Sequence, residues 1–266
     1  MGRVARALII HELLERARDR WVIVTTLLFA LLATGIAAYG RSAGDAAAVV
    51  TAPSLVTLNA FLVPLVALIL GHDAIVGERE RHTLGLLVSL PVSRWEILVA
   101  KFVGRGLALC VAICVGFGAA AVWLSPAQRP VVLSLLGPSI LLGASFLSLG
   151  VLLSSASRKV ATAASLAVVS WFLLILFYDL ALLTAMVATD GALSQDTVAW
   201  LVTLNPAGLY RTSLMNQLVG VDALKELGLV VSMPGSRARA MVWFAWIALP
   251  LVAGAGLLSR RHAVTA

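Results

Sequence analysis

The residues of this chain that could do chemistry are few, and their spacing does not form a catalytic site. The histidines are scattered, without an HExxH or nucleophile–base pattern beside them: His11, His72, His82 and His262. Cys110 and Cys114 share a helix face, where a soft metal ion could bind, although buried cysteine also behaves as a small hydrophobic residue. A phosphate-binding loop needs Gly-Lys followed by Ser or Thr, and the sequence has no such tripeptide. We therefore expect no metal site, no nucleotide site and no catalysis.

Charged residues gather instead in one stretch, GERERHTLGLLVSLPVSRWEILVAKF, at residues 77–102. Four consecutive charges open it, and the leucines of the following run, Thr83–Ser89, have helical spacing. Leu90-Pro91 ends that run, because the residue before a proline avoids helical dihedrals. Ser93 and Glu96 then match a capping box that starts the next helix. This order of charges, short helix, proline and capped helix predicts a small folded segment at the membrane surface and not a plain linker.

The remaining sequence has the composition of a membrane protein. Hydrophobic residues make up 61% of the chain, charged residues 12%, and the mean hydropathy is +0.99, whereas about a quarter of a soluble domain is charged. Six windows contain no Asp, Glu, Lys or Arg and are long enough for a helix to cross a membrane: residues 21–40, 46–71, 106–128, 130–157, 160–178 and 240–259. We predict an all-α polytopic membrane protein with six transmembrane helices in a single domain, residues 1–266.

The basic residues predict how these helices are oriented. With the N-terminus in the cytoplasm, the inner segments hold 14 of the 20 Lys and Arg residues, in agreement with the positive-inside rule. Both termini are then cytoplasmic. The net charge of +7 follows from this topology, so we expect the lipid bilayer, and no nucleic acid, beside these charges.

Residues 3–20 are predicted to form an amphipathic helix on the cytoplasmic face. Ala7, Ile10 and Leu14 recur at three- and four-residue steps and form an apolar stripe. Glu12 and Arg16 belong to a polar face on the other side and are spaced for an i,i+4 ion pair. A helix of this kind lies in the plane of the membrane interface.

The connection before the last window is long, residues 189–241. Its part 197–210 is uncharged, is too short to cross the membrane and is broken at Asn205-Pro206, which predicts an interfacial or re-entrant helix. Connections of this length are usually functional. The segment is expected either to dock a partner or to cap the outer mouth of the protein.

Two acidic residues, Asp73 and Asp179, lie at the ends of apolar windows. A carboxylate in such a place is costly unless it meets water, cargo or a basic partner. Each is expected either at an ordinary helix end or beside a translocation path, and Arg211 is a candidate partner for Asp179.

The stretch at residues 77–102 resembles the first cytoplasmic loop of type-2 ABC transporter permeases, whose usual wording is close to E-x-E-x-G-T-L-E-L-L-L-S-x-P-x-S-R-x-x-I-x-x-G-K. The chain departs from it at His82, Gly85 and Ala100, where glycine, glutamate and glycine are usual. Six spans, the N-terminal helix and the long loop before the last span fit the same family. The resemblance implies the type-2 ABC exporter fold and a separate ATPase that binds ATP and Mg, so that this chain needs no cofactor of its own.

The same resemblance implies roles for the residues of this loop. It docks into a groove of the ATPase, with the charges setting the docking electrostatics and two leucines filling the groove: Glu78, Arg79, Glu80, Arg81, Thr83, Leu84, Leu87, Pro91, Ser93 and Arg94. One chain supplies six spans, so a homodimer enclosing a path is expected. Gly116, Ala120 and Gly254 could allow close helix contact, either between subunits or within one.

Further residues resemble one branch of the family, the permeases needed to mature nitrous-oxide reductase. The similarity lies at residues 61–65, 73–78, 177–180 and 200–211 and at Gly104. It implies a bacterial inner membrane, a dimer of the ATPase NosF below two permeases, the periplasmic β-helical protein NosD above, and copper delivery by the lipoprotein NosL. The expected cargo is a sulfur species for the copper–sulfur centre of the reductase.

This narrower resemblance places two sets of site residues. Asp179 and Asp73 are expected along the translocation path, and contact with NosD is expected on the long loop: Asn205, Pro206, Tyr210, Arg211, Arg237 and Arg239. Other functions stay open. A type-2 permease could export a lipid, a drug or an ion, a secondary transporter would need inverted repeats and mid-membrane acids, and a membrane-embedded enzyme would need a catalytic pattern.

Overall fold

The computed structural model describes residues 3–42, 45–89, 91–126, 129–218 and 233–263. Six helical stretches in this part of the chain are long and apolar enough to cross a membrane: Val22–Ser42, Pro53–Glu80, Arg94–Trp123, Val132–Ala156, Val160–Ala188 and Ser236–Leu258. Each overlaps one of the six predicted windows, so the prediction of a helical protein with six spans is confirmed. A helix satisfies its own backbone hydrogen bonds, which lipid cannot do.

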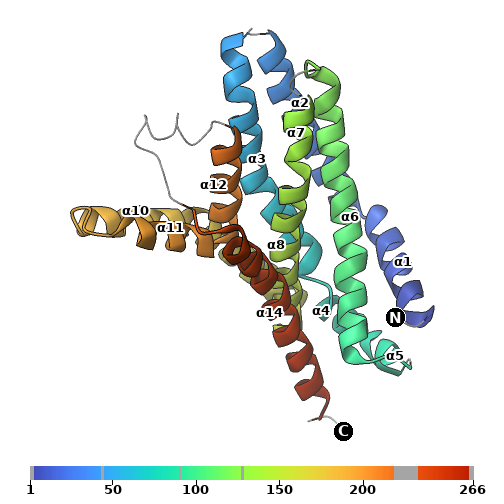
Figure 1. Ribbon diagram of the computed structural model, residues 1–266. Helices are drawn as coiled ribbons and strands as arrows, with labels where there is room; N and C mark the ends of the chain where they lie inside the picture. Colours follow the sequence, from blue (N-terminus) through green and yellow to red (C-terminus); the bar gives the residue numbers. More distant parts are fainter. Residues whose placement is uncertain (1–2, 43–44, 90, 127–128, 219–232, 264–266) are drawn as a thin grey trace.

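The elements are labelled in Figure 1. In chain order they are α1 (Arg3–Ala17), α2 (Arg20–Ser42), α3 (Asp45–Gly71), α4 (Val76–Glu80), α5 (Leu84–Ser89), α6 (Arg94–Trp123), α7 (Arg129–Ser134), α8 (Leu136–Ala156), α9 (Val160–Phe172), the π-helical segment η1 (Leu173–Phe177), α10 (Tyr178–Ala188), α11 (Gln195–Leu204), α12 (Pro206–Leu218) and α14 (Ser236–Ala263).

The centre of the bundle is formed by α3, α6 and α8, with α2 packed on α3 and α6, α14 on α8, and α1 on α6 (Figure 1). Small residues allow close approach. A Cβ atom on Gly150 would lie 2.9 Å from the Cα atom of Gly71, so α3 and α8 meet backbone to backbone. Gly116 makes room for the ring of Phe29, and Gly254 lies against α6 and α8. Of the two alternatives for Gly116 and Gly254, the structure shows packing within one subunit.

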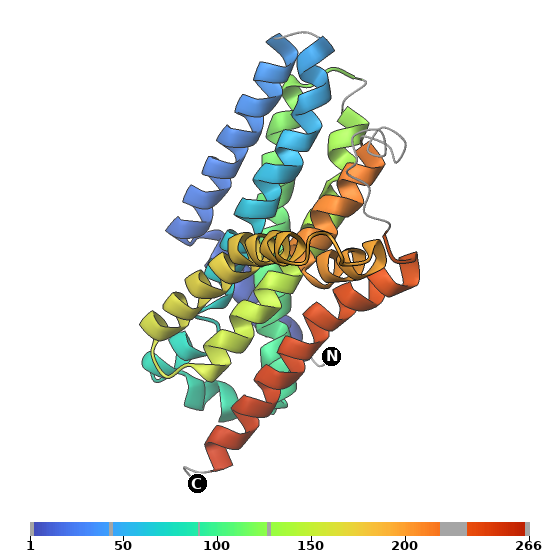
Figure 2. The same cartoon turned by 90° about the vertical axis from the view of Figure 1, so that its left-hand side faces the viewer.

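Both ends of the described chain lie at the same end of the bundle as α4 and α5 (Figures 1 and 2). An even number of spans requires this arrangement. The assignment of that end to the cytoplasm stays a prediction from the distribution of Lys and Arg residues.

Span five changes direction at a π-helical segment. Helix α9 passes into η1 and then into α10, which lies across the bundle in Figure 1, and π-helical turns are a known cause of kinks. The side-chain amide of Asn205 donates to the carbonyl of Leu174 within η1 at 2.6 Å, and Tyr178 Oη donates to the carbonyl of Leu201 at 2.6 Å. These bonds hold α11 against the bend.

Asn205-Pro206 ends α11 as predicted, but it also starts a second helix, α12, that the sequence analysis did not predict. Asn205 Oδ1 accepts from the amide of Ala207 at 3.0 Å, and proline is favoured at the first helical position. The dipeptide therefore carries a start signal as well as a stop signal. Helix α12 then runs along the bundle and packs on α3 and α8.

Candidate functional site

Residues 77–102, called the coupling segment after the role that the family resemblance implies, fold as their sequence predicts. It contains α4, α5 and the start of α6, and Ser93 and Glu96 form the predicted capping box: Ser93 Oγ accepts from the amide of Glu96 at 3.1 Å, and Glu96 Oε2 accepts from the amide of Ser93 at 2.9 Å. His82 has a φ of 58°, in the left-handed region that favours glycine. This explains why glycine is usual at that position in the family resembled.

The first two charges of the segment bond to two different elements. Glu78 Oε1 accepts from Nζ of Lys101 in α6 at 2.8 Å. Nη1 of Arg79 donates to the carbonyl of Ser157, in the turn between α8 and α9. The hydroxyl of Thr83 donates back to the carboxylate of Glu78 and so fixes the start of α5.

The next two charges reach two more elements. Glu80 Oε1 accepts from the amide of Val160, the first residue of α9, at 2.8 Å, where the helix dipole favours a negative charge. Nη1 of Arg81 lies 3.3 Å from Oε1 of Glu15 in α1. The four charges therefore hold four different contacts within the chain.

Arg94 adds the last spanning helix to these contacts, because its Nη1 donates to the carbonyl of Leu258 in α14 at 2.9 Å. The segment is bonded to α1, α6, the α8–α9 turn and α14. A displacement of the segment must consequently act on all of them. These charges were expected to act on a partner protein, and in the structure they bond to groups within the chain.

The expected docking role of Leu84 is wrong. Only 4% of its surface is exposed, and it packs in a cluster with Ala74, Leu98 and Leu258. Leu87 is half-buried, whereas Pro91 and Ser93 are exposed. Any partner surface on this segment must therefore use residues other than Leu84.

Two cations inside span three are held by carboxylates from two other segments, α1 and the end of span two. Lys101 Nζ lies 2.9 Å from Oε2 of Glu12 as well as 2.8 Å from Glu78. Arg105 Nε lies 2.6 Å from Oε1 of Glu12, and its Nη1 pairs with Asp73. Arg16 completes the set, 3.0 Å from Asp73 and 3.6 Å from Glu12. We call these six residues the ion network: Glu12, Arg16, Asp73, Glu78, Lys101 and Arg105.

The ion network changes the interpretation of α1. The predicted Glu12–Arg16 pair is confirmed, but the polar face that carries it packs on α6 and is buried. Burial raises the pKa of Glu12, yet the charges of Arg105, Lys101 and Arg16 outweigh it and hold this pKa below its ordinary value. For Arg16 burial lowers the pKa, and the surrounding carboxylates, with Asp73 first, raise it above its ordinary value.

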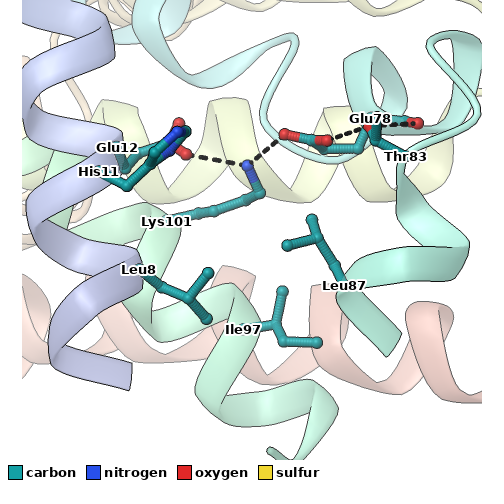
Figure 3. Close-up of a pocket in the computed structure, with 8 residues that line it drawn as sticks. All are labelled: Leu8, His11, Glu12, Glu78, Thr83, Leu87, Ile97 and Lys101. Carbon is teal, nitrogen blue, oxygen red and sulfur yellow. Dashed lines mark hydrogen bonds and ion pairs between the residues drawn. The ribbon is translucent and has the colours of Figure 1, made fainter. Parts of the chain in front are cut away.

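A cavity of about 250 Å³ lies between α1, the coupling segment and α6 (Figure 3). Lys101 stands between Glu12 and Glu78 along one side of it, while Leu8, Leu87 and Ile97 lie on the other side. The cavity thus has one charged side, formed by the ion network, and one apolar side, and it lies at the predicted cytoplasmic end.

The carboxylate of Asp73 is paired with Arg105 and Arg16 within the ion network. This gives Asp73 a structural role, and its place along a translocation path stays a prediction. Asp179 differs, because its carboxylate pairs with Nη2 of Arg211 and both side chains remain partly exposed. The predicted Asp179–Arg211 pair is confirmed.

Three residues expected to contact a periplasmic partner are buried within the chain: Asn205, Pro206 and Tyr210. Tyr210 Oη accepts from Nδ2 of Asn59 at 3.2 Å and lies 3.1 Å from Oγ of Ser139. These residues fasten α12 to the bundle, so partner contact is excluded for them in this conformation. Arg237 is exposed and Arg239 is partly exposed. Much of the long loop, residues 219–232, lies outside the described part of the chain.

Sequence reasoning missed three functional candidates. Trp95 is 44% exposed at the start of α6, and a tryptophan inside the capping box was the available signal. Lys101 and Arg105 are four residues apart at the entrance to an apolar window, and cations in such places require carboxylate partners. Among the described residues no group of three or more His, Cys, Asp or Glu could hold a metal ion.

Comparison with known proteins gives a consistent result. The family described as "ABC-2 family transporter protein" matches residues 6–263. A "Probable ABC transporter permease protein NosY" of Pseudomonas aeruginosa is 42% identical over 258 residues, covering 92% of each chain. The protein of the same name from Stutzerimonas stutzeri is 38% identical over 266 residues, covering 94% of this chain and 96% of the relative.

Glu12→Gln is expected to lower the free energy of unfolding by about 3–5 kcal/mol, because it leaves Lys101 and Arg105 buried with a lost counter-charge. Unfolding of the detergent-solubilised protein by SDS measures this loss. Glu15→Gln is the matched control on the same helix. The Glu15 side chain is 36% exposed and lies 3.3 Å from Arg81 and 4.0 Å from both His11 and Arg16, so its loss should cost less than about 1 kcal/mol. Equal losses in the two variants would contradict the assignment.

The same comparison predicts a dependence on pH. Since the pKa of Glu12 is lowered in the folded chain from the ordinary 4.5, its charge stabilises the fold fully above that value. This contribution is lost as the pH falls through the folded-state pKa. The stability gap between wild type and Glu12→Gln should therefore be constant above about pH 4.5 and shrink below it.

Proposed function

The chain belongs to the ABC-2 family of transporter proteins, and we propose that it is a permease subunit that couples ATP hydrolysis by a separate ATPase to movement of a substrate across the membrane. The observation that carries this proposal is the bonding of the coupling segment. Its charges contact α1, α6, the α8–α9 turn and α14, as a part that receives force from outside the chain must do. ATP and Mg belong to the ATPase, since this sequence has no phosphate-binding loop.

The contacts suggest how the force travels. A displacement of α4 moves α6 through Glu78 and Lys101, and it moves span five through Glu80 at the first residue of α9. Arg94 carries the same displacement to the end of α14. The charged side chains bond to other parts of the same chain, so we expect the ATPase to dock on exposed residues of the segment.

Trp95 is our candidate for the docking anchor. It is large, aromatic and 44% exposed next to the exposed Pro91 and Ser93, and buried aromatic anchors dominate the energetics of protein interfaces. Half-buried Leu87 can contribute its open side.

Trp95→Ala is expected to weaken binding of the ATPase by about thirtyfold, the loss typical of an interface hot spot. Binding of purified ATPase to the permease in nanodiscs measures it. Trp123→Ala is the matched control, because Trp123 is 47% exposed at the opposite end of the same helix. An unchanged affinity in Trp95→Ala, or the same loss in the control, would refute the assignment of Trp95.

We propose further that the transporter serves the maturation of nitrous-oxide reductase in the bacterial inner membrane. Two relatives named NosY, 42% and 38% identical over nearly the whole chain, support this. The proposed assembly is a permease homodimer with the ATPase NosF, the periplasmic protein NosD and copper supplied through NosL. The proposed cargo is a sulfur species for the copper–sulfur centre.

Within this function, Asp179 is our candidate for the outer end of the path. It is the acidic member of a partly exposed pair with Arg211, beside the π-helical bend of span five. Because both side chains of this pair are partly exposed, either one can exchange its partner for a passing ion at a modest cost in free energy.

Asp179→Asn should lower the amount of active nitrous-oxide reductase in cells by about tenfold while the permease complex stays assembled, since it removes the charge that sits at the proposed path. Reductase activity and complex yield are measured together. Asp190→Asn is the control, an exposed acid in the following turn. Normal maturation in Asp179→Asn would leave the pair as a structural contact only.

The outer end of α14 is our candidate contact for NosD. Arg237 is exposed there, and Nε of Arg239 is buried without a hydrogen-bond partner among the described residues. Cations at the rim of an interface mainly steer association and set register.

Arg237→Glu should slow association of NosD about tenfold at low salt, with a smaller effect at high salt, and leave ATPase binding unchanged. Stopped-flow or surface-based kinetics with purified NosD measure this. Arg41→Glu, at another exposed arginine, serves as the control. If both variants associate at the wild-type rate, the long loop acts as a lid and not as a docking surface.

A further inference from the structure

Helix α1 has two faces of opposite character. Its inward face carries Glu12 and Arg16 into the ion network, while its outward face is exposed from end to end: Arg6, Ala7, Ile10, Leu14 and Ala17. Ile10 and Leu14 are 47% and 54% exposed. These five residues are spaced by one, three or four positions and share one side of the helix, and the exposed Arg18 follows directly in the turn after it.

The outward face is not simply apolar, because an arginine stands at each end of it. Arg6 and Arg18 are exposed, and neither guanidinium forms an ion pair with another residue in the described part of the chain. Arg6 lies in the first turns of α1 and Arg18 directly after its last residue, Ala17, so they are about 18 Å apart at the rise of a helix. The face thus offers two separate cations flanking two large aliphatic side chains.

We propose that this face binds anionic phospholipids, and that lipid binding regulates coupling through the ion network. The apolar side chains enter the acyl region while Arg6 and Arg18 take the phosphate groups. Membrane binding of an amphipathic helix grows with buried apolar area and with attraction to anionic headgroups. Each arginine near an anionic surface strengthens binding about fivefold.

Charge complementarity favours an anionic lipid over a zwitterionic one. Binding through Ile10 and Leu14 alone would not distinguish headgroups, whereas two cations that have no counter-charge among the described residues favour a negative surface.

The inward face links this site to the coupling segment. Glu12 shares Lys101 with Glu78, at 2.9 Å and 2.8 Å, so α1 and α4 hold the same ammonium group. Arg81 of the segment also pairs with Glu15 of α1. When lipid fixes the outward face, Glu12 is fixed as well, and Lys101 stays in place to receive a displacement from Glu78. This regulatory half of the inference rests on the proposed function.

Lipid binding is tested on the permease alone, by native mass spectrometry in detergent with added phosphatidylglycerol or phosphatidylcholine. The wild type should retain phosphatidylglycerol in preference to phosphatidylcholine. Arg6→Gln and Arg18→Gln should each weaken retention of phosphatidylglycerol about fivefold and leave phosphatidylcholine unchanged. Arg41→Gln, an exposed arginine on α2, should behave as wild type. Unchanged retention in the α1 variants, or an equal loss in the control, overturns the site.

Regulation is tested on the permease–ATPase complex in nanodiscs of phosphatidylcholine with and without phosphatidylglycerol. Phosphatidylglycerol should raise ATP hydrolysis by the wild type several-fold, while Arg6→Gln with Arg18→Gln should keep the rate seen in phosphatidylcholine. A lipid-independent rate in the wild type overturns the regulatory half. Release of the ATPase by the α1 variants would instead identify the face as a protein contact and overturn the inference.

Failure of the proposed function has a different signature. A permease that has no effect on hydrolysis in either lipid contradicts coupling to the ATPase, and the binding measurement on the permease alone still decides whether α1 holds anionic lipid.

Discussion

The arrangement of this end of the molecule depends on Lys101 and Arg105, which are buried at the start of span three. The side chains of Lys101 and Arg105 are 7% and 1% exposed, and an isolated charge in such a place would cost many kcal/mol or lose its ionisation. Both therefore need carboxylates, and α6 supplies none that reaches them. Glu12 comes from α1 and Asp73 and Glu78 from the end of span two, so three separate segments are drawn to one point.

This requirement explains why a short helix at the start of the chain and a loop between spans form one unit. Buried ion pairs add little net stability compared with a well-packed apolar cluster, because desolvation offsets most of the attraction. Their effect is on geometry, since removal or displacement of one member leaves another charge uncompensated. An arrangement of this kind suits a part that must move as a whole. The apolar cluster around Leu84 supplies the packing that the ion network does not.

A structural feature could be predicted from the sequence where the residues that determine it lie close together in the chain. The six spans, the α5 helix and the Ser93–Glu96 cap follow from periodicity and spacing within a few residues, and all appear in the structure. The partners of Glu78 and Glu80 lie 23 and 80 positions away, and no local rule places them. The burial of Leu84 could not be predicted either. Helical spacing identifies an apolar face, but it does not tell whether that face is covered by the same chain or by a partner protein. The Asp179–Arg211 pair could be predicted because few charges of either sign lie on that side.

The two ends of the molecule hold charge in different ways, and this difference bears on how the protein can move. At one end six charged groups neutralise each other in a buried set, so separating any two of them exposes a charge to a medium of low dielectric constant. At the other end a single pair, Asp179 with Arg211, is partly exposed and can part at much lower cost. Tyr210, next to Arg211, is fastened to α3 and α8 through Asn59 and Ser139. Arg211 is consequently held to the fixed bundle while Asp179 rides on span five beyond its π-helical bend. In the proposed function, a displacement that enters through Glu80 at the first residue of α9 is transmitted along span five to this partly exposed pair, and we expect the pair to separate before the buried ion network does.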